Sequence, residues 1–157
     1  MYRDVSEVLT LRGQVDLVAL DAAGRIKDVR HIRNTVVKTG YAWVSGALSG
    51  SNATADMKYI GIGTGSTAAA TTDTALGAEV ESRATGTQTN ITVTNTNDTY
   101  QCVGTVSITD TRAITEAGIF SASSDGQMLN RTVFSAINLS SGDSLQVTFK
   151  VTVGAAA

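Results

Sequence analysis

The chain contains no proline, one cysteine and one histidine among its 157 residues. A single cysteine, Cys102, cannot form an intramolecular disulfide, and a single histidine, His31, provides no histidine cluster for a metal ion. Aromatic residues make up 5% of the chain, and the formal net charge is −2. A charge this close to zero gives no general attraction to nucleic acids or to anionic membranes.

Long apolar runs are also missing. No stretch approaches the roughly 18 apolar residues of a transmembrane helix, so none is predicted. The N-terminal residues Met-Tyr-Arg-Asp-Val-Ser-Glu are charged and lack the apolar segment of a signal peptide. We therefore expect the protein to be made and assembled in a cytoplasm, with no membrane partner.

Threonine and serine make up almost a quarter of the chain, and β-branched residues dominate its regularly patterned segments, which favours strands. The clearest strand lies near the C-terminus, where apolar residues alternate with polar ones: Leu145, Val147, Phe149, Val151 and Val153. Such alternation predicts one buried face. Two turns, Ser-Ser-Asp-Gly and Ser-Ser-Gly-Asp, divide residues 113–153 into three runs and predict a β-meander.

The remaining segments predict further strands and one helix. The expected strands are a hairpin at 14–20 and 25–32, followed by 57–64, 85–94 and 99–109. Residues 38–48 predict a helix that covers an open face or end of the sheet, because Tyr41, Val44 and Leu48 recur at helical spacing beside Trp43. Residues 65–74 predict a surface loop, and 74–81 a brief helical turn.

Together these segments predict a mainly β protein, a β-sandwich or jelly-roll-like domain of seven to nine strands with one short helix. Residues 1–13 have no clear periodicity and predict an N-terminal arm that orders on a partner, or an edge strand. Residues 14–157 are expected to form a single β-rich domain.

Basic residues are concentrated between Arg25 and Lys38, where five of the twelve lysines and arginines occur. This segment has three interpretations: a solvated strand face, a patch that docks on an acidic protein surface, or a nucleic-acid site. No interleaved aromatic residues support the last. The candidate contact residues of a docking patch, with two from the N-terminal segment, are Tyr2, Arg3, Arg25, Lys27, Arg30, His31 and Arg33.

Two short motifs resemble catalytic signatures but lack the required context. Gly61-Ile-Gly63-Thr-Gly65-Ser66 is close to a phosphate-binding loop, yet it departs from the dinucleotide fingerprint at Ser66 and lacks a following Gly-Lys-Ser/Thr. Gly142-Asp143-Ser144-Leu145 matches a serine hydrolase signature, yet the only histidine lies far upstream. We interpret the first as close backbone packing and the second as a hairpin turn.

Glu116 and Cys102 are the other residues with potential chemistry. Glu116 interrupts an apolar strand, so it either faces solvent or points inward and needs backbone N–H donors or a partner such as Arg131. Cys102 falls in step with Tyr100, Val106 and Ile108 and is expected to be a buried, inert thiol. No metal cluster, nucleophile–base pair or cofactor fingerprint accompanies them, so the sequence predicts neither enzyme activity nor a cofactor.

Four segments in order resemble small structural proteins of tailed bacteriophages. They are Tyr59–Gly65 (Tyr-Ile-Gly-Ile-Gly-Thr-Gly), Thr72–Glu79 (Thr-Asp-Thr-Ala-Leu-Gly-Ala-Glu), Ile114–Phe120 (Ile-Thr-Glu-Ala-Gly-Ile-Phe) and Val133–Thr148 (from Val-Phe-Ser-Ala to Leu-Gln-Val-Thr). The resemblance covers roughly residues 34–153 and is greatest to the capsid decoration, or cement, proteins. Ile114–Phe120 is also similar to segments of phage tail-fibre and tail-collar proteins.

The resemblance implies a β-rich, non-enzymatic protein on the outer surface of a virion capsid. Its implied partners are the phage major capsid protein and further copies of itself, as a dimer or trimer, with no nucleic acid. Two alternatives stay open. One is a tail-fibre, collar or baseplate component, although the chain has no heptads for a shaft. The other is a carbohydrate-binding module whose stacking aromatics would be Tyr41, Trp43, Tyr59 and Tyr100.

Overall fold

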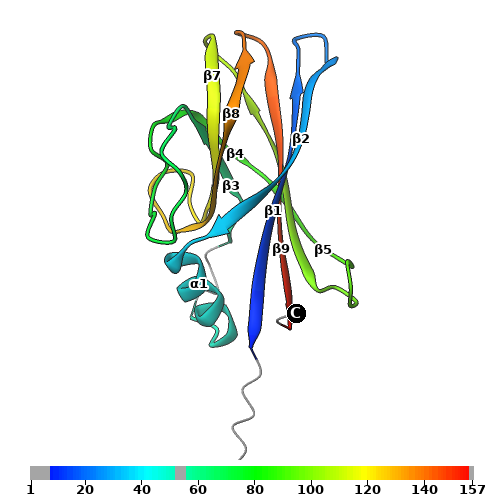
Figure 1. Cartoon of the computed structure of the whole chain (residues 1–157), viewed down its shortest axis with the longest axis vertical. Coiled ribbons are helices and arrows are strands. Elements are labelled where there is room, and N and C mark those ends of the chain that lie inside the picture. The colour runs from blue at the N-terminus through cyan, green and yellow to red at the C-terminus, as the bar shows by residue number, and fades with distance from the viewer. Residues whose placement is uncertain (1–7, 52–55, 156–157) are drawn as a thin grey trace, which may run out of the picture.

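A computed structural model describes residues 8–51 and 56–155 of the chain (Figure 1). Within these residues the protein has nine strands and one short helix, in agreement with the predicted fold class. In chain order the elements are β1 (Leu9–Leu20), β2 (Ile26–Val36), α1 (Lys38–Leu48), β3 (Tyr59–Gly63), β4 (Glu79–Thr85), β5 (Thr87–Ile91), β6 (Thr99–Ser107), β7 (Arg112–Phe120), β8 (Met128–Leu139) and β9 (Ser144–Ala155).

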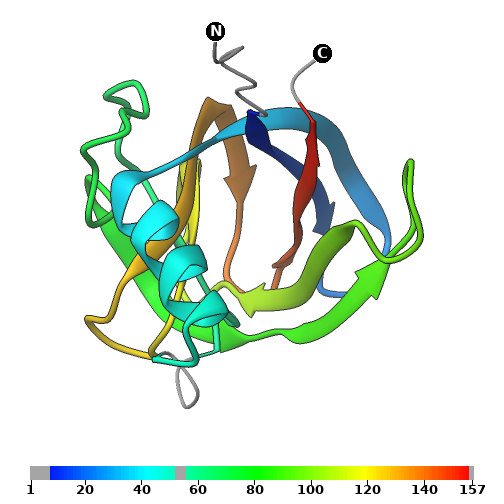
Figure 2. The same ribbon diagram turned by 90° about the horizontal axis from the view of Figure 1, so that it is seen from below.

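The strands form one antiparallel sheet that folds back on itself, in the order β4-β3-β7-β8-β2-β1-β9-β6-β5. One half of the sheet is β4-β3-β7-β8 and the other is β1-β9-β6-β5. β2 connects these two halves, because it pairs with β1 as far as Asn34 and then with β8 at Thr35 and Val36. On the other side the chain crosses between the halves at Gly86, which alone separates β4 from β5. Seen from below, the two halves enclose a common interior (Figure 2). The architecture is a β-sandwich, as predicted.

The interior is filled by apolar side chains from the inner faces of both halves. In β9 the alternating residues Leu145, Val147, Phe149 and Val151 are buried, which confirms the predicted buried face of the strand except at its last residue, Val153, which is 39% exposed. They pack with residues of the opposite half, such as Ile60. A second, smaller cluster surrounds Phe120.

The first hairpin and the helix lie where the sequence predicts them. β1 and β2 pair around a turn in which Gly24 has a φ of 80°, a conformation open to glycine. α1 spans the predicted residues 38–48, and its Trp43 packs against the main core beside β8. The predicted apolar face of the helix is only partly covered, because Tyr41 is 47% and Leu48 85% exposed.

The predicted meander is wrong in its second half. β7 and β8 pair as neighbours, but β9 lies between β1 and β6. The β1–β2 hairpin is inserted between β8 and β9, so the last two strands belong to different halves of the sandwich. The turn at 140–143 is a crossing between the halves, a long-range arrangement that alternating residues in one segment cannot specify.

Two other local predictions are also corrected. Residues 74–78 form no helical turn, because the backbone N–H groups of Gly77 and Ala78 are held by the carboxylate of Glu116. The predicted strand 85–94 is divided between two strands: its first residue, Thr85, is the last residue of β4, and Thr87–Ile91 form β5.

The proposed boundary between residues 13 and 14 falls inside β1. Leu9 to Gly13 pair with β9, so this part of the expected arm is an integral strand of the sheet. β1 lies between β2 and β9 rather than at an edge of the sheet. The rest of the expected arm, residues 1–7, lies outside the described residues.

Candidate interaction surface

Most of the basic residues singled out in the sequence are engaged within the protein. Arg25 pairs with Asp21 at 2.8 Å within the hairpin turn. Lys27 reaches Asp143 at 2.6 Å. These pairs place both cations beside carboxylates of their own chain, which reduces their attraction for an acidic partner.

Arg30 is held in a similar way. Its Nη2 atom lies 2.8 Å from Asp28 Oδ2, and its Nη1 atom donates to the backbone oxygen and, at 2.7 Å, to the hydroxyl of Ser135. The guanidinium therefore joins β2 to β8. Tyr2 and Arg3, the two other candidate residues, lie outside the described part of the chain.

His31 belongs to a small polar cluster on the outer face of β1, β2 and β9. Its Nδ1 atom lies 2.7 Å from Asp16 Oδ1, and Lys150 donates to the other oxygen of the same carboxylate at 2.6 Å. Partial burial opposes ionisation of Asp16, but the hydrogen bonds from His31 and Lys150 outweigh it and lower its pKa. Within this cluster the positive charge of Lys150 is compensated by the carboxylate of Asp16.

Arg33 differs from its neighbours. It forms no ion pair with any residue in the ranges 8–51 and 56–155, and neither does Arg12 on the adjacent strand. Arg33 pairs in register with Gln14, so Arg12, Gln14 and Arg33 share the outer face of the sheet. Both guanidiniums are exposed. Of the candidate residues that are described, Arg33 alone keeps its charge available, and Arg12 joins it.

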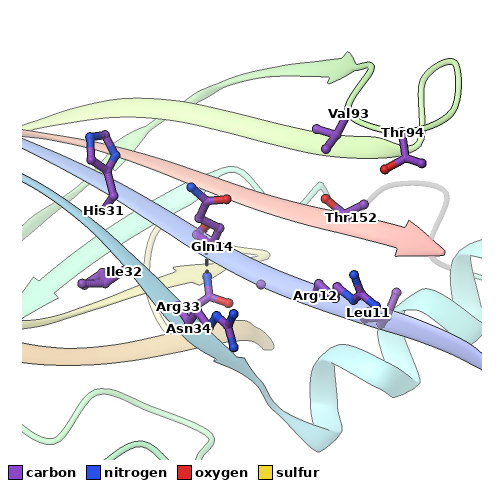
Figure 3. A pocket seen from close by; sticks show the side chains of 11 residues that line it. Leu11, Arg12, Gln14, His31, Ile32, Arg33, Asn34, Val93, Thr94 and Thr152 are labelled. Carbon is purple, nitrogen blue, oxygen red and sulfur yellow. Dashed lines mark hydrogen bonds between the residues drawn. The ribbon is translucent and has the colours of Figure 1, made fainter. Parts of the chain in front are cut away.

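These two arginines line a groove of about 840 Å³. Figure 3 shows the groove extending from Arg33 and Asn34 on β2, across β1 and Thr152 on β9, to Val93 and Thr94. Its remaining lining residues are Leu11, Arg12, Gly13, Gln14, His31 and Ile32. None of the lining residues is acidic, although the chain as a whole has a net charge of −2.

The far wall of the groove is fixed by Asp98. Its carboxylate accepts hydrogen bonds from the backbone N–H groups of Val93, Thr94 and Asn95 at 2.7 to 3.0 Å. These bonds lower the pKa of Asp98 to about 2. The loop is thus preorganised and holds Val93, which is 60% exposed, at the rim of the groove.

The near wall is a fork between β1 and β2. The β1–β2 ladder begins at the pair Gly13–Asn34, whereas the β1–β9 ladder continues to Leu9. The Asn34 side chain lies across Gly13, where an added Cβ would come within 1.5 Å of its Oδ1 atom. Asn34 donates to the backbone oxygen of Gln14 and accepts from Asn130 at 3.1 Å. The fork is therefore maintained by specific contacts.

Beyond the fork, the inner face of β1 continues as an apolar cleft of about 390 Å³. It is lined by Leu9, Thr10 and Leu11 of β1 and by Tyr41 and Val44 of α1. Leu9 is 64% exposed and Tyr41 47%. Leu11 lines both the cleft and the basic groove, so the two form one continuous surface around the end of β1.

A different polar cluster is buried inside the protein. Glu116 is fully buried and accepts hydrogen bonds from the backbone N–H groups of Gly65, Gly77 and Ala78 at 2.8 to 3.0 Å. Arg131 donates to its Oε2 atom. Arg131 also pairs with Asp73 at 2.7 Å. This arrangement confirms the inward alternative for Glu116.

The cluster accounts for the glycine motif. A Cβ on Gly63 would lie 2.4 Å from Glu116 Oε1, and one on Gly65 would lie 2.5 Å from it. Within the motif, the backbone N–H of Gly65 donates to the Glu116 carboxylate and that of Thr64 to the backbone oxygen of Ala78, so neither is available to a phosphate. Burial opposes ionisation of Glu116, but the hydrogen bonds outweigh it, so its pKa is lowered and the carboxylate stays ionised.

The remaining chemical candidates are separated or buried. Ser144 pairs with Leu20, whereas His31 pairs with Asp16 four residues away along β1, a separation of about 13 Å at strand spacing. Cys102 is fully buried, and burial raises the pKa of its thiol. Within the described ranges no group of three or more His, Cys, Asp or Glu side chains could hold a metal ion. No helix there has the length and apolarity needed to cross a membrane.

Comparisons of the chain with protein-family models, with curated proteins and with solved structures give no match.

Proposed function

We propose that this protein is a non-enzymatic structural component of a tailed-phage virion that binds the outer surface of the capsid and stabilises the shell. Its partners are the major capsid protein and, in a dimer or trimer, further copies of itself. The protein would be made in the bacterial cytoplasm and located on the capsid. Bridging neighbouring capsid subunits would stabilise the assembled lattice by mass action, and repetition over the shell would add avidity.

One observation carries the proposal: the four segments that resemble phage structural proteins meet at Glu116. Glu116 lies in the segment Ile114–Phe120, and it accepts hydrogen bonds from Gly65 of the first segment and from Gly77 and Ala78 of the second. Val133, which begins the fourth, is its partner in the β7–β8 ladder. Segments far apart in sequence therefore build one structural cluster, which supports a likeness of the whole domain.

The non-enzymatic part of the proposal rests on how reactive groups are used. Glu116 holds a loop and Cys102 is buried. The residues of β1 that pair with Ser144 and with His31 are four positions apart, about 13 Å at strand spacing. A serine without an adjacent base is a weak nucleophile. The exposed surface features, in contrast, are grooves and apolar side chains suited to contacts with another protein.

The test is co-sedimentation of the purified protein with capsids and, separately, with tails of the phage that encodes it, both prepared without this protein. Saturable binding to capsids at hundreds of copies per particle is the expected result. Binding of a few copies to tails and none to capsids would replace the proposal with a tail-fibre, collar or baseplate role. Deleting residues 2–7, which include the candidate contacts Tyr2 and Arg3, tests whether this segment contributes to capsid binding. A longer deletion would remove residues of β1, which begins at Leu9.

A further inference from the structure

We infer that the N-terminal end of β1 is a docking site for an extended segment of a partner protein in which apolar and acidic residues alternate. The inference rests on the proposed function only for the identity of the partner, a capsid protein. The surface consists of the basic groove around Arg12 and Arg33 and the apolar cleft around Leu9 and Tyr41.

The position of the site follows from the fork between β1 and β2. β1 continues to Leu9 beside β9, whereas β2 turns away after Asn34 to pair with β8. Groove and cleft both open at this point and share Leu11. An added strand would lie beside β1 where β2 leaves it, which is the geometry of strand addition to a sheet.

The two faces of β1 determine the chemistry of that strand. Leu9 and Leu11 point to the inner side, opposite Tyr41 and Val44 of α1. Arg12 lies on the outer side with Arg33. Side chains of an added strand alternate between these two sides, and neighbouring strands interact face by face. Apolar residues would therefore pack in the cleft, and acidic residues would meet the arginines.

The charge distribution favours an acidic protein segment over other occupants. The groove has two arginines without an ion-pair partner in the described residues and no acidic lining residue. No Phe, Trp or Tyr side chain lines the groove, so it lacks the rings on which successive bases of a nucleic acid would stack. A second copy joined through the same edge would bring the arginines of both copies together, and like charges repel.

The side chains that make up the site are available without disturbing the core. Leu9 is 64% exposed, and Arg12 and Arg33 are exposed as well. The walls, in contrast, are fixed: Asn34 is held by Asn130, and Val93 by the carboxylate of Asp98. A preorganised site loses less conformational entropy on binding, which favours a short segment.

The experiment measures binding of a peptide of four Val-Glu repeats to the purified protein by calorimetry at low salt. Four variants are compared with the unchanged chain: Arg12→Glu/Arg33→Glu and Leu9→Ser in the site, and Arg25→Glu and Ile26→Ser outside it. We expect the double charge reversal to weaken binding about tenfold or more, and the effect to shrink at high salt. Leu9→Ser should also weaken binding, because it removes the apolar contact in the cleft.

The controls lie outside the site. Arg25→Glu reverses one arginine at the distant hairpin turn, half the charge change of the double variant, and Ile26→Ser removes an apolar side chain that is 66% exposed, close to the 64% of Leu9. Both should bind like the unchanged chain. Equal binding of a Val-Lys repeat peptide, no binding of the Val-Glu peptide, or equal loss in Arg25→Glu would each overturn the inference.

Capsid binding separates this inference from the proposed function. If the unchanged protein and Arg12→Glu/Arg33→Glu saturate capsids equally, the docking site is wrong while the virion role stands. If the protein binds the Val-Glu peptide through these residues but binds neither capsids nor tails, the site stands and the virion role fails.

Discussion

Arg131 donates both of its hydrogen bonds with Glu116 to a single oxygen atom: its Nε and Nη2 atoms lie 3.0 and 2.8 Å from Oε2. The other oxygen, Oε1, is left for the backbone N–H groups of Gly65 and Ala78. This division lets one carboxylate hold a strand and a loop at once. The pair thus fastens residues 65–78 to the β7–β8 part of the sheet.

We expect Arg131→Met to destabilise the protein by about 3–5 kcal/mol, because it leaves the buried carboxylate of Glu116 without an opposite charge. Glu116→Gln should cost less, because Arg131 keeps its ion pair with Asp73. The glutamine amide would still direct N–H donors toward backbone donors. Urea unfolding at pH 7 measures the free energies. Asp110→Asn, which removes an exposed carboxylate, is the matched control and should change stability little.

The double variant Glu116→Gln/Arg131→Met tests whether the residues act as a pair. Because the first change already removes the interaction, the second should cost much less than it does alone. Fully additive losses would show that Arg131 acts chiefly through Asp73 and Thr67, its other partners.

Acid should destabilise the protein below about pH 5. The pKa values of Glu116 and Asp98 are lowered in the folded protein from 4.5 and 3.8, that of Asp98 to about 2. A lowered pKa gives stability that is complete above the unfolded-state value and is lost as the pH falls toward the folded-state value. Unfolding free energies measured from pH 7 to pH 2 should therefore be level down to about pH 5 and then decrease.

The variant Asp98→Asn identifies one source of this dependence. It should reduce the slope of stability against pH mainly between about pH 4 and pH 2, the interval between the two pKa values of Asp98. An unchanged slope would mean that the bonds to Val93, Thr94 and Asn95 do not depend on the carboxylate charge.

The sequence predicted the local elements of the fold well where side-chain patterns are strong. The alternation of β9 gave its buried face, and helical spacing gave α1 with its bounds. The neighbours of β9 were wrong, because an alternating strand specifies which face is buried and not which strand lies beside it. The absence of a helix at 74–78 depends on Glu116, some 40 residues away, and so lies beyond local propensity.

The candidate surface could be predicted only in part. The sequence located a basic segment, but charge counting could not show that Arg25, Lys27 and Arg30 have acidic partners across turns and strands. Arg12 was missed because it lies outside the basic segment, and only the register of β1 brings it to the face of Arg33. Its position between apolar Leu11 and Gly13 was the available signal.

Gly13→Ala should destabilise the protein by about 1–3 kcal/mol. We expect the cause to be displacement of the Asn34 side chain and not strain in the backbone of residue 13. The added Cβ would lie 1.5 Å from Asn34 Oδ1, so this side chain must rotate away and release the buried amide of Asn130. Asn34→Ala should cost a similar amount. Combined, the two changes should cost no more than Asn34→Ala alone. An additive loss would contradict the view that Gly13→Ala acts by displacing the Asn34 side chain.

Cys102 should be unreactive in the folded protein. Its side chain is fully buried and burial raises the pKa of the thiol, so little thiolate is present and no reagent reaches it. Labelling with a chromogenic disulfide at pH 8 should proceed only as fast as the protein opens, and at once in concentrated urea. Gly86→Ala should accelerate labelling, because its Cβ would lie 2.4 Å from Cys102 Sγ and force the crossing between β4 and β5 to shift. Equally slow labelling of this variant would show that the crossing accommodates a methyl group without opening the core.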